Sequence, residues 1–234
     1  ETPLLSIDGQ TIYFNSERTG SRQVFRMSVL GGTPEQITFH TEGSILEDIH
    51  PTKPVLLVSG YRDHGGRAPY RLIEKPLDPT KDEQLLFDAD ARNGRYSPDG
   101  KKILFLNNGV DPYRKGYHGS QASRVWIYDI ASRTFTEPVK DETGCRHPLW
   151  APDGRSFYFV TSRSGAFNIW QHSFKKNKTR QLTEHPDDSV IDPTLSRDGK
   201  TLVYRHLLDF YSLPTSPRSK PSAIDLHHRT TLEH

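Results

Sequence analysis

The segment Tyr96-Ser97-Pro98-Asp99-Gly100-Lys101-Lys102-Ile103-Leu104-Phe105-Leu106 combines a tight turn with an apolar run of strand length. Ser suits the first position of a type I turn, Pro presets the backbone of the second, and Gly takes the fourth without steric cost. The pattern recurs as Ser6-Ile7-Asp8-Gly9, Ala151-Pro152-Asp153-Gly154 and Ser196-Arg197-Asp198-Gly199, each followed by a short apolar run. The chain is therefore built from a repeated unit of strand, turn and strand.

The spacing of these turns predicts five repeats. Their glycines stand at 9, 100, 154 and 199, so the gaps are 91, 54 and 45 residues. The first gap is close to twice the last, which predicts a degenerate copy near its middle, and His50-Pro51-Thr52-Lys53-Pro54 before Val55-Leu56-Leu57-Val58 fits. A period of about 47 residues with several short strands is typical of a β-propeller. We expect an all-β propeller of five four-stranded blades, either closed or an open piece of a six- or seven-bladed parent.

The repeats also predict the domain limits. We expect one domain over residues 1–231, with blades at about 1–40, 41–88, 89–141, 142–185 and 186–231. Leu232-Glu233-His234 resembles the start of a vector-encoded histidine tag, and the absence of an initiator methionine predicts that an upstream segment has been removed.

Two repeats are expected to carry insertions between their second and third strands. These are residues 107–124 in repeat three and residues 205–221 in repeat five. Such loops emerge on the face that holds the blade-to-blade connections, opposite the Asp-Gly turns. Insertions gathered on one face of a repeat protein often mark its binding face, so we call this the insertion face.

The composition excludes several classes of partner and site. The chain has 31 Lys and Arg against 29 Asp and Glu, a formal net charge of +2, without a dense basic run, so no nucleic-acid partner is expected. Cys145 is the only cysteine, which excludes an intrachain disulfide and a cysteine-rich zinc site. No apolar run approaches the length of a membrane span, so membrane insertion is not expected.

Catalytic and metal motifs are not recognisable. There is no Gly-x-Ser-x-Gly elbow, and no serine comes with a convincing base. Asp8, Asp99, Asp153 and Asp198 occupy one turn in each blade, so they diverge around the ring and are expected to be structural rather than calcium ligands. His185-Pro186-Asp187-Asp188 is best interpreted as a blade-to-blade turn rather than a metal site. We expect no catalytic residue, no metal and no cofactor.

The central channel offers one group of candidate binding residues. The innermost strands precede the turns and contain several polar residues, namely Asp48, His50, Arg92, Asn93, Arg146, His147 and Asp192. Mixed charge there would suit the docking of a peptide with two charged ends. The alternative is a water-filled hole lined by solvated polar groups.

The insertion of repeat three offers a second group of candidates. Arg114 and Lys115 suit a carboxylate, while Tyr113 and Tyr117 offer rigid contact area. The alternative is an Ω-like loop that packs over the neighbouring blade. The full set of candidate binding residues is Tyr113, Arg114, Lys115, Tyr117 and His118 from the insertion, with Arg92, Arg146 and His147 from the inner strands.

Several motifs resemble known families. Ser97-Pro98-Asp99-Gly100, Ala151-Pro152-Asp153-Gly154 and Gln181-Leu182-Thr183 resemble the WD40-like (PD40) repeats of TolB-type propellers. Arg114-Lys115-Gly116-Tyr117-His118-Gly119-Ser120-Gln121-Ala122-Ser123 before Val125-Trp126-Ile127-Tyr128-Asp129, and the segment from Trp150 to Val160, resemble the N-terminal propeller of tricorn-like S41 serine peptidases. The resemblance covers the chain from Ser6 to about Tyr211.

This resemblance implies a non-catalytic module that filters or admits peptides. In tricorn-like peptidases the nucleophilic serine lies in a separate C-terminal domain beside a PDZ-like domain, so no catalytic residue transfers to any position here. The implied partners are peptides, a protein, or those domains of a parent chain, in a periplasmic or otherwise extracytoplasmic setting. One alternative is a TolB-like scaffold that docks envelope proteins. Another is a propeller hydrolase acting on sugars, which needs converging carboxylates such as Asp48 and Asp192.

Overall fold

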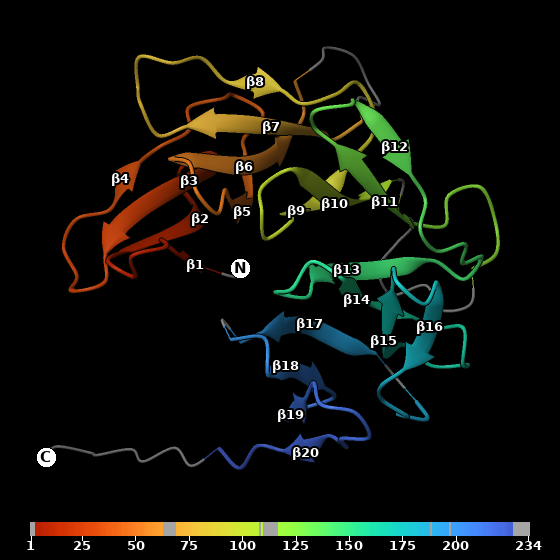
Figure 1. Cartoon of the computed structure of the whole chain (residues 1–234). Coiled ribbons are helices and arrows are strands. Elements are labelled where there is room, and N and C mark those ends of the chain that lie inside the picture. Colours follow the sequence, from red (N-terminus) through yellow and green to blue (C-terminus); the bar gives the residue numbers. More distant parts are fainter. Residues whose placement is uncertain are drawn as a thin grey trace, which may run out of the picture.

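The computed structural model describes residues 3–62, 69–107, 109, 117–187, 189–196 and 198–226. Five antiparallel sheets of four strands each stand around a common centre, and no described residue is helical (Figure 1). The predicted five-bladed β-propeller is therefore confirmed.

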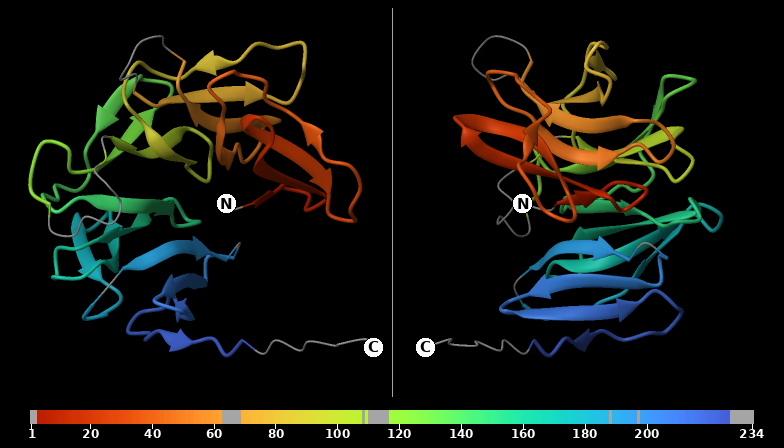
Figure 2. Two further views of the ribbon diagram at one scale, coloured as in Figure 1. Left: turned by 180° about the vertical axis from the view of Figure 1, so that it is seen from behind. Right: turned by 90° about the vertical axis from the view of Figure 1, so that its left-hand side faces the viewer.

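Each blade is one sheet whose four strands follow in chain order from the centre outward (Figure 2). Blade one contains β1 (Leu4–Leu5), β2 (Thr11–Thr19), β3 (Ser21–Ser28) and β4 (Glu35–Gln36). Blade two contains β5 (Ile45–Ile49), β6 (Val55–Gly60), β7 (Arg71–Pro76) and β8 (Gln84–Leu85). Blade three contains β9 (Arg92–Tyr96), β10 (Lys102–Asn107), β11 (Arg124–Asp129) and β12 (Thr134–Thr136). Blade four contains β13 (Cys145–Trp150), β14 (Ser156–Thr161), β15 (Asn168–Ser173) and β16 (Lys178–Gln181). Blade five contains β17 (Val190–Leu195), β18 (Thr201–His206), β19 (Asp209–Pro214) and β20 (Ser222–Ala223).

Blade five corrects one prediction. The expected long loop over residues 205–221 is wrong, because a tight turn at Leu207 and Leu208 leads directly into β19, which pairs with β18 along its whole length. The reason lies in packing: Leu213 is buried and Tyr211 is partly buried against blade four, two residues apart as a strand requires. The sequence has no glycine at this turn, and Leu207 instead adopts a φ of 55°.

The Asp-Gly turns are held by bonds within a few residues. The Ser97 hydroxyl donates to Asp99 Oδ1 at 2.6 Å and accepts the Lys102 amide at 2.9 Å, and Asp99 Oδ1 also accepts the Lys101 amide at 3.1 Å. The same bonds recur at Ser6 and Ser196. The serine hydroxyl is the main reason why the pKa values of Asp8, Asp99 and Asp198 are lowered. These three aspartates are structural, as predicted.

The degenerate turn of blade two has the same length but a different cap. The His50 amide bonds the Val55 carbonyl at 2.9 Å, as the Ser97 amide bonds the Lys102 carbonyl at 2.8 Å. His50 Nδ1 accepts the amides of Thr52 and Lys53, both at 3.1 Å, and so replaces the hydroxyl and carboxylate of the other copies. His50 is 2% exposed, so the prediction that it lines the channel is wrong.

Successive turns also pack on one another around the ring. A Cβ added to Gly154 would lie 3.8 Å from Pro98, one added to Gly100 would press on His50 and Pro51, and one added to Gly199 would overlap Pro152. Each of these glycines has a φ between 64° and 69°. They therefore serve both the turn and the contact with the preceding blade.

Large apolar side chains fill the space between neighbouring blades. Blades three and four meet through Leu104 and Val125 on one side and Phe157 and Phe159 on the other, all fully buried or nearly so. Equivalent clusters join blades one and two, two and three, and four and five. This packing holds the inner strands at fixed positions around the centre.

Candidate functional site

The inner strands share a bulge that turns polar residues toward the centre. Asn93, His147 and Asp192 occupy the same place in β9, β13 and β17, where one extra residue interrupts the pairing with the second strand. Their φ angles are 51°, 47° and 47°, in the left-handed region that Asn, Asp and His enter more readily than most residues. The bulges therefore direct the side chains of Asn93, His147 and Asp192 toward the channel at the same level.

These residues converge across the ring. Asn93 of blade three and Asp192 of blade five line the same cavity of about 360 Å³, and His147 Nδ1 lies 3.9 Å from Asp192 Oδ1. Burial lowers the pKa of His147, more than Asp192 raises it, so the imidazole is biased toward its neutral form. The remaining lining residues of the cavity are Leu4, Asn15, Arg22, Ile45, Leu46, Glu47, Ser59, Tyr70, Arg92 and Arg95.

An aromatic and cationic cluster stands at the insertion-face end of this cavity. Arg92 Cζ lies 4.8 Å from the centre of the Tyr70 ring, and Tyr70 lies 4.3 Å from Tyr61, centre to centre. Asp90 Oδ1 accepts the Tyr70 amide at 3.1 Å and is 3.6 Å from Arg92 Nη2. Arg92 Nε is buried and makes no hydrogen bond within the described part of the chain. The cluster thus combines rigid aromatic surface with a positioned guanidinium.

Arg146 holds the corresponding place at the start of β13. Its Cζ lies 3.7 Å from the centre of the Phe167 ring, in the loop between β14 and β15. Arg92 and Arg146 therefore each stack on an aromatic ring beside the channel. The structure thus places Arg92 and Arg146 at this end, and it brings Arg92 together with Asn93 and Asp192 in one cavity.

Two acidic residues of β5 make their hydrogen bonds within the protein, between neighbouring blades. The Glu47 carboxylate accepts the Ser59 hydroxyl at 2.7 Å and the Asn93 amide at 3.0 Å, while Arg95 donates to the Glu47 carbonyl. Asp48 accepts the amides of Ile49 at 2.9 Å and Tyr96 at 2.8 Å, one on each oxygen. Burial raises the pKa values of both carboxyls, although Arg95 opposes this. Glu47 and Asp48 therefore fasten blade two to blade three.

Only part of the predicted insertion site can be located. Tyr113, Arg114 and Lys115 lie outside the described residues. Tyr117 is half-buried and His118 is exposed, and a Cβ at Gly109 would lie 3.6 Å from Arg92 Nη1. The described start of the insertion therefore lies beside the arginine at the channel.

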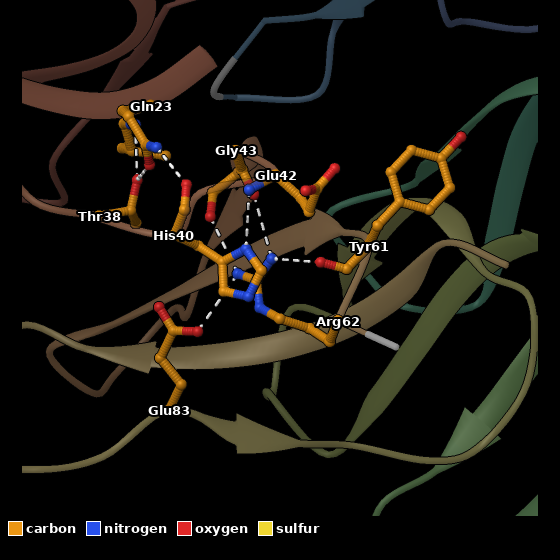
Figure 3. A network of polar contacts seen from close by, with 10 residues as sticks. Gln23, Thr38, His40, Glu42, Gly43, Tyr61, Arg62 and Glu83 are labelled. Atoms are coloured by element: carbon orange, nitrogen blue, oxygen red, sulfur yellow. Dashed lines mark hydrogen bonds and ion pairs between the residues drawn. The ribbon is translucent and has the colours of Figure 1, made fainter. Parts of the chain in front are cut away.

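Two arginines that the sequence reasoning missed lock the insertion face. Arg62, just after β6, donates to the Gly43 carbonyl at 3.0 Å and the Ser44 hydroxyl at 2.9 Å in the connection from blade one, and to Glu83 at 3.2 Å (Figure 3). Arg163 holds the equivalent place after β14 and donates through Nε to Asp141 Oδ2 at 2.9 Å. An arginine two residues after the second strand of two repeats is the signal that could have revealed this lock.

The remaining titratable cluster belongs to the joint between blades four and five. His185 Nε2 is 2.9 Å from the Tyr204 hydroxyl, and its ring stacks on His206 at 3.9 Å. Across the described ranges no three His, Cys, Asp or Glu residues form a group that could hold a metal ion. In the same part of the chain no helix is long and apolar enough to cross a membrane.

Comparison with known proteins decides the family. Residues 1–218 match the family model described as the tricorn protease N-terminal beta propeller domain. The chain belongs to this family. We refer to it below as a tricorn-type propeller.

This tricorn-type propeller is similar in sequence to a peptidase and in fold to TolB. It is 26% identical over 190 residues to an uncharacterized protein of Agrobacterium fabrum, covering 79% of this chain and 58% of that protein. It is 26% identical over 106 residues to Tricorn protease of Thermoplasma acidophilum, covering 45% of this chain and 9% of that protein. TolB from Acinetobacter baumannii superposes with a TM-score of 0.75 at 16% identity, covering 95% of this chain and 53% of that one, which shows a shared fold. The matched region is thus only part of each relative.

Proposed function

We propose that this tricorn-type propeller is a non-catalytic module that binds peptides, or extended segments of proteins, at the insertion-face end of its channel. The observation that carries the proposal is the convergence of Tyr70 and Arg92 with Asn93 and Asp192 around one cavity, with Tyr61 packed on Tyr70 beside it.

The chemistry of this cluster suits peptide recognition. Tyrosine and arginine dominate the binding energy of protein interfaces because they offer large contact area and several donors at low entropic cost. Arg92 lines the cavity with a side chain that is 37% exposed, so its guanidinium can donate to a carbonyl or carboxylate of a ligand. Asp192, with a side chain 70% exposed, offers an acceptor for a ligand amine on the other side. A peptide presents both kinds of group.

The same geometry speaks against the sugar-hydrolase alternative. Glycoside hydrolysis needs two carboxyl groups that face the bond to be broken. Both oxygens of Asp48 already accept backbone amides, so only Asp192 of the predicted pair is turned toward ligand.

The match to the tricorn family supports a wider setting for this module. We propose that it belongs to a tricorn-like serine peptidase of an extracytoplasmic compartment, with the serine nucleophile and a PDZ-like domain elsewhere in the parent chain. In that setting the propeller would select what reaches the catalytic domain.

The test is to incubate the purified chain with a mixed peptide library and to read cleavage and retention by mass spectrometry. We expect no cleavage and selective retention, which weakens in the Arg92→Ala and Tyr61→Ala variants. Arg26→Ala is the matched control, because its side chain is 38% exposed against 37% for Arg92 and pairs with Glu35 on the outer strands.

Three outcomes would overturn the proposal. Cleavage that disappears when a residue of this chain is substituted would make the propeller an enzyme. Equal loss of retention in Arg26→Ala and Arg92→Ala would remove the channel end as the site. Capture of a folded protein without retention of any peptide would favour the TolB-like scaffold.

A further inference from the structure

A basic groove lies on the opposite face of the propeller, beside the Asp-Gly turn of blade four. Its volume is about 580 Å³, and Pro217 of blade five forms one side of it. Five of its lining residues are cationic, namely Arg155, Lys175, Lys176, Lys178 and Arg180. This concentration of charge contrasts with the near balance of the chain as a whole, whose formal net charge is +2.

The positive charge of this groove is not neutralised from within. Asp153 is its only acidic lining residue, and the Asp153 carboxylate accepts the Arg155 amide of its own turn at 2.9 Å. None of the ion pairs found among the described residues involves any of the five cations. Neighbouring like charges raise one another's energy, so an anion from outside would relieve this repulsion.

Part of the groove is held in position before any ligand arrives. Arg180 Nε donates to Gln171 Oε1 at 2.9 Å, and Gln171 Nε2 donates to the Ser156 hydroxyl at 3.0 Å. This chain of bonds runs across three strands of blade four and fixes the direction of the guanidinium. A pre-oriented arginine loses less conformational entropy when it binds a carboxylate.

A second groove lies on the other side of the same β15–β16 turn and shares Asp153 with the first. Its volume is about 790 Å³, and its apolar lining includes Ile127, Pro138, Trp150 and Phe174. Trp150 is held by a bond of 3.1 Å from its indole nitrogen to the Arg95 carbonyl, and its ring lies 5.8 Å from that of Phe174. A cationic groove and an aromatic groove therefore flank one turn.

We propose that these two grooves form a docking surface for an acidic, extended segment of a protein partner that also carries a large apolar side chain. The carboxylates would pair with the five cations, and the apolar side chain would lie on Trp150 and Phe174. Arginine and lysine bind carboxylates through charge-assisted hydrogen bonds, and a half-buried aromatic wall is the usual anchor of an extended segment. The neighbouring groove mixes Lys102 and Lys140 with Asp99, Asp153 and Glu137, so it suits the apolar side chain of the segment rather than a further row of phosphates or carboxylates.

The test measures fluorescence anisotropy of a labelled oligoglutamate peptide that contains one central phenylalanine. We expect saturable binding that weakens as salt is added, and a loss of about tenfold in affinity for the double variant Lys175→Glu and Lys176→Glu. The matched control is the double variant Lys53→Glu and Lys81→Glu, which changes the net charge equally at exposed residues of the same type in blade two, away from both grooves. This control should bind as the unaltered chain does.

Two further probes separate the surface from its alternatives. Replacing the phenylalanine of the peptide by serine should weaken binding, because the aromatic groove then loses its occupant. Arg92→Ala should leave this binding unchanged, so the two faces are tested independently. Equal losses in both double variants, no binding at all, or stronger binding of a single-stranded oligonucleotide than of the peptide would overturn the proposal.

Discussion

The two faces of the propeller are held by different kinds of interaction. On the face of the Asp-Gly turns, each turn is closed by bonds between residues at most five apart, such as those of Ser97 with Asp99 and Lys102. On the insertion face, Arg62 and Arg163 reach back to the connection from the preceding blade, about twenty residues away. The turns of the first face are closed by local bonds, whereas the loops of the second face are held by tertiary contacts.

Asparagine side chains show how far the insertion face depends on such contacts. Asn15 of blade one donates to the Ser44 carbonyl at 2.8 Å and accepts the Leu46 amide at 2.9 Å, which ties β2 to the inner strand of blade two. Asn168 does the same for the connection that leaves blade four, through the carbonyl and amide of His185. The comparison of the two faces therefore predicts which substitutions lower the free energy of unfolding most.

The largest expected effect is on the insertion face. Arg163→Ala removes the cation from Asp141, whose side chain is 2% exposed and lies 2.8 Å from Arg163 Nη2. A buried carboxylate left without its partner costs about 3–5 kcal/mol, and chemical denaturation should show a fall of this size in the free energy of unfolding. Adding Asp141→Asn to the variant should recover part of the loss, and an unchanged loss would mean that the charge is not the cause.

The second largest loss of stability is expected on the face of the Asp-Gly turns, which we call the turn face. Gly199→Ala forces a Cβ into Pro152 at a φ of 69°, which we expect to cost about 2–4 kcal/mol. Gly9→Ala is the matched control, because its φ is 71° but nothing lies within 4 Å of the added Cβ. That control should cost only about 1–2 kcal/mol, and equal costs in thermal unfolding would show that the contact with Pro152 is unimportant.

A smaller loss of stability is expected for Arg62, the other arginine of the insertion face. Arg62→Ala removes bonds to a carbonyl, a hydroxyl and Glu83, whose side chain is 28% exposed and can be solvated instead. We expect a loss of about 1–2 kcal/mol, measured by the same denaturation as for Arg163→Ala. A loss as large as that of Arg163→Ala would show that the acceptor type does not set the strength of this lock.

The smallest effect concerns the one turn that a histidine caps. Burial lowers the pKa of His50 below its ordinary value of 6.5, so between these two pKa values the folded state binds fewer protons than the unfolded state. The contribution of His50 to the free energy of unfolding is complete above pH 6.5, and it falls as the pH drops toward the lowered pKa. The triple variant His50→Ser, Thr52→Asp and Lys53→Gly installs the Ser-Pro-Asp-Gly turn of blade three.

The measurement is the midpoint of thermal unfolding at several pH values between about 5 and 7. The triple variant should show a shallower pH dependence than the unaltered chain, while the contributions of His147, His172 and His185 remain. An unchanged slope would exclude His50 as a source of the pH dependence.

The turn face could be predicted from the sequence because its bonds are local. The Ser-Pro-Asp-Gly pattern defined the turns, and its spacing located even the degenerate copy at His50. The hairpin of blade five was missed because Leu207 and Leu208 carry no turn signal, and packing of Leu213 against blade four sets its register.

The candidate site was predicted less completely for the same reason. Arg92, Asn93 and Asp192 were identified because they precede recognisable turns. Tyr61 and Tyr70 were not, since they join Arg92 only when blades two and three are side by side. The left-handed bulges of the inner strands likewise depend on pairing with the second strand.

The contact between successive turns has a direction. Gly100, Gly154 and Gly199 each meet a proline that lies earlier in the chain, at 51, 98 and 152, whereas Gly9 meets nothing within 4 Å. During synthesis on a ribosome, every glycine in this series emerges after the surface that receives it. Each blade can therefore dock on the blade before it as soon as it leaves the exit tunnel.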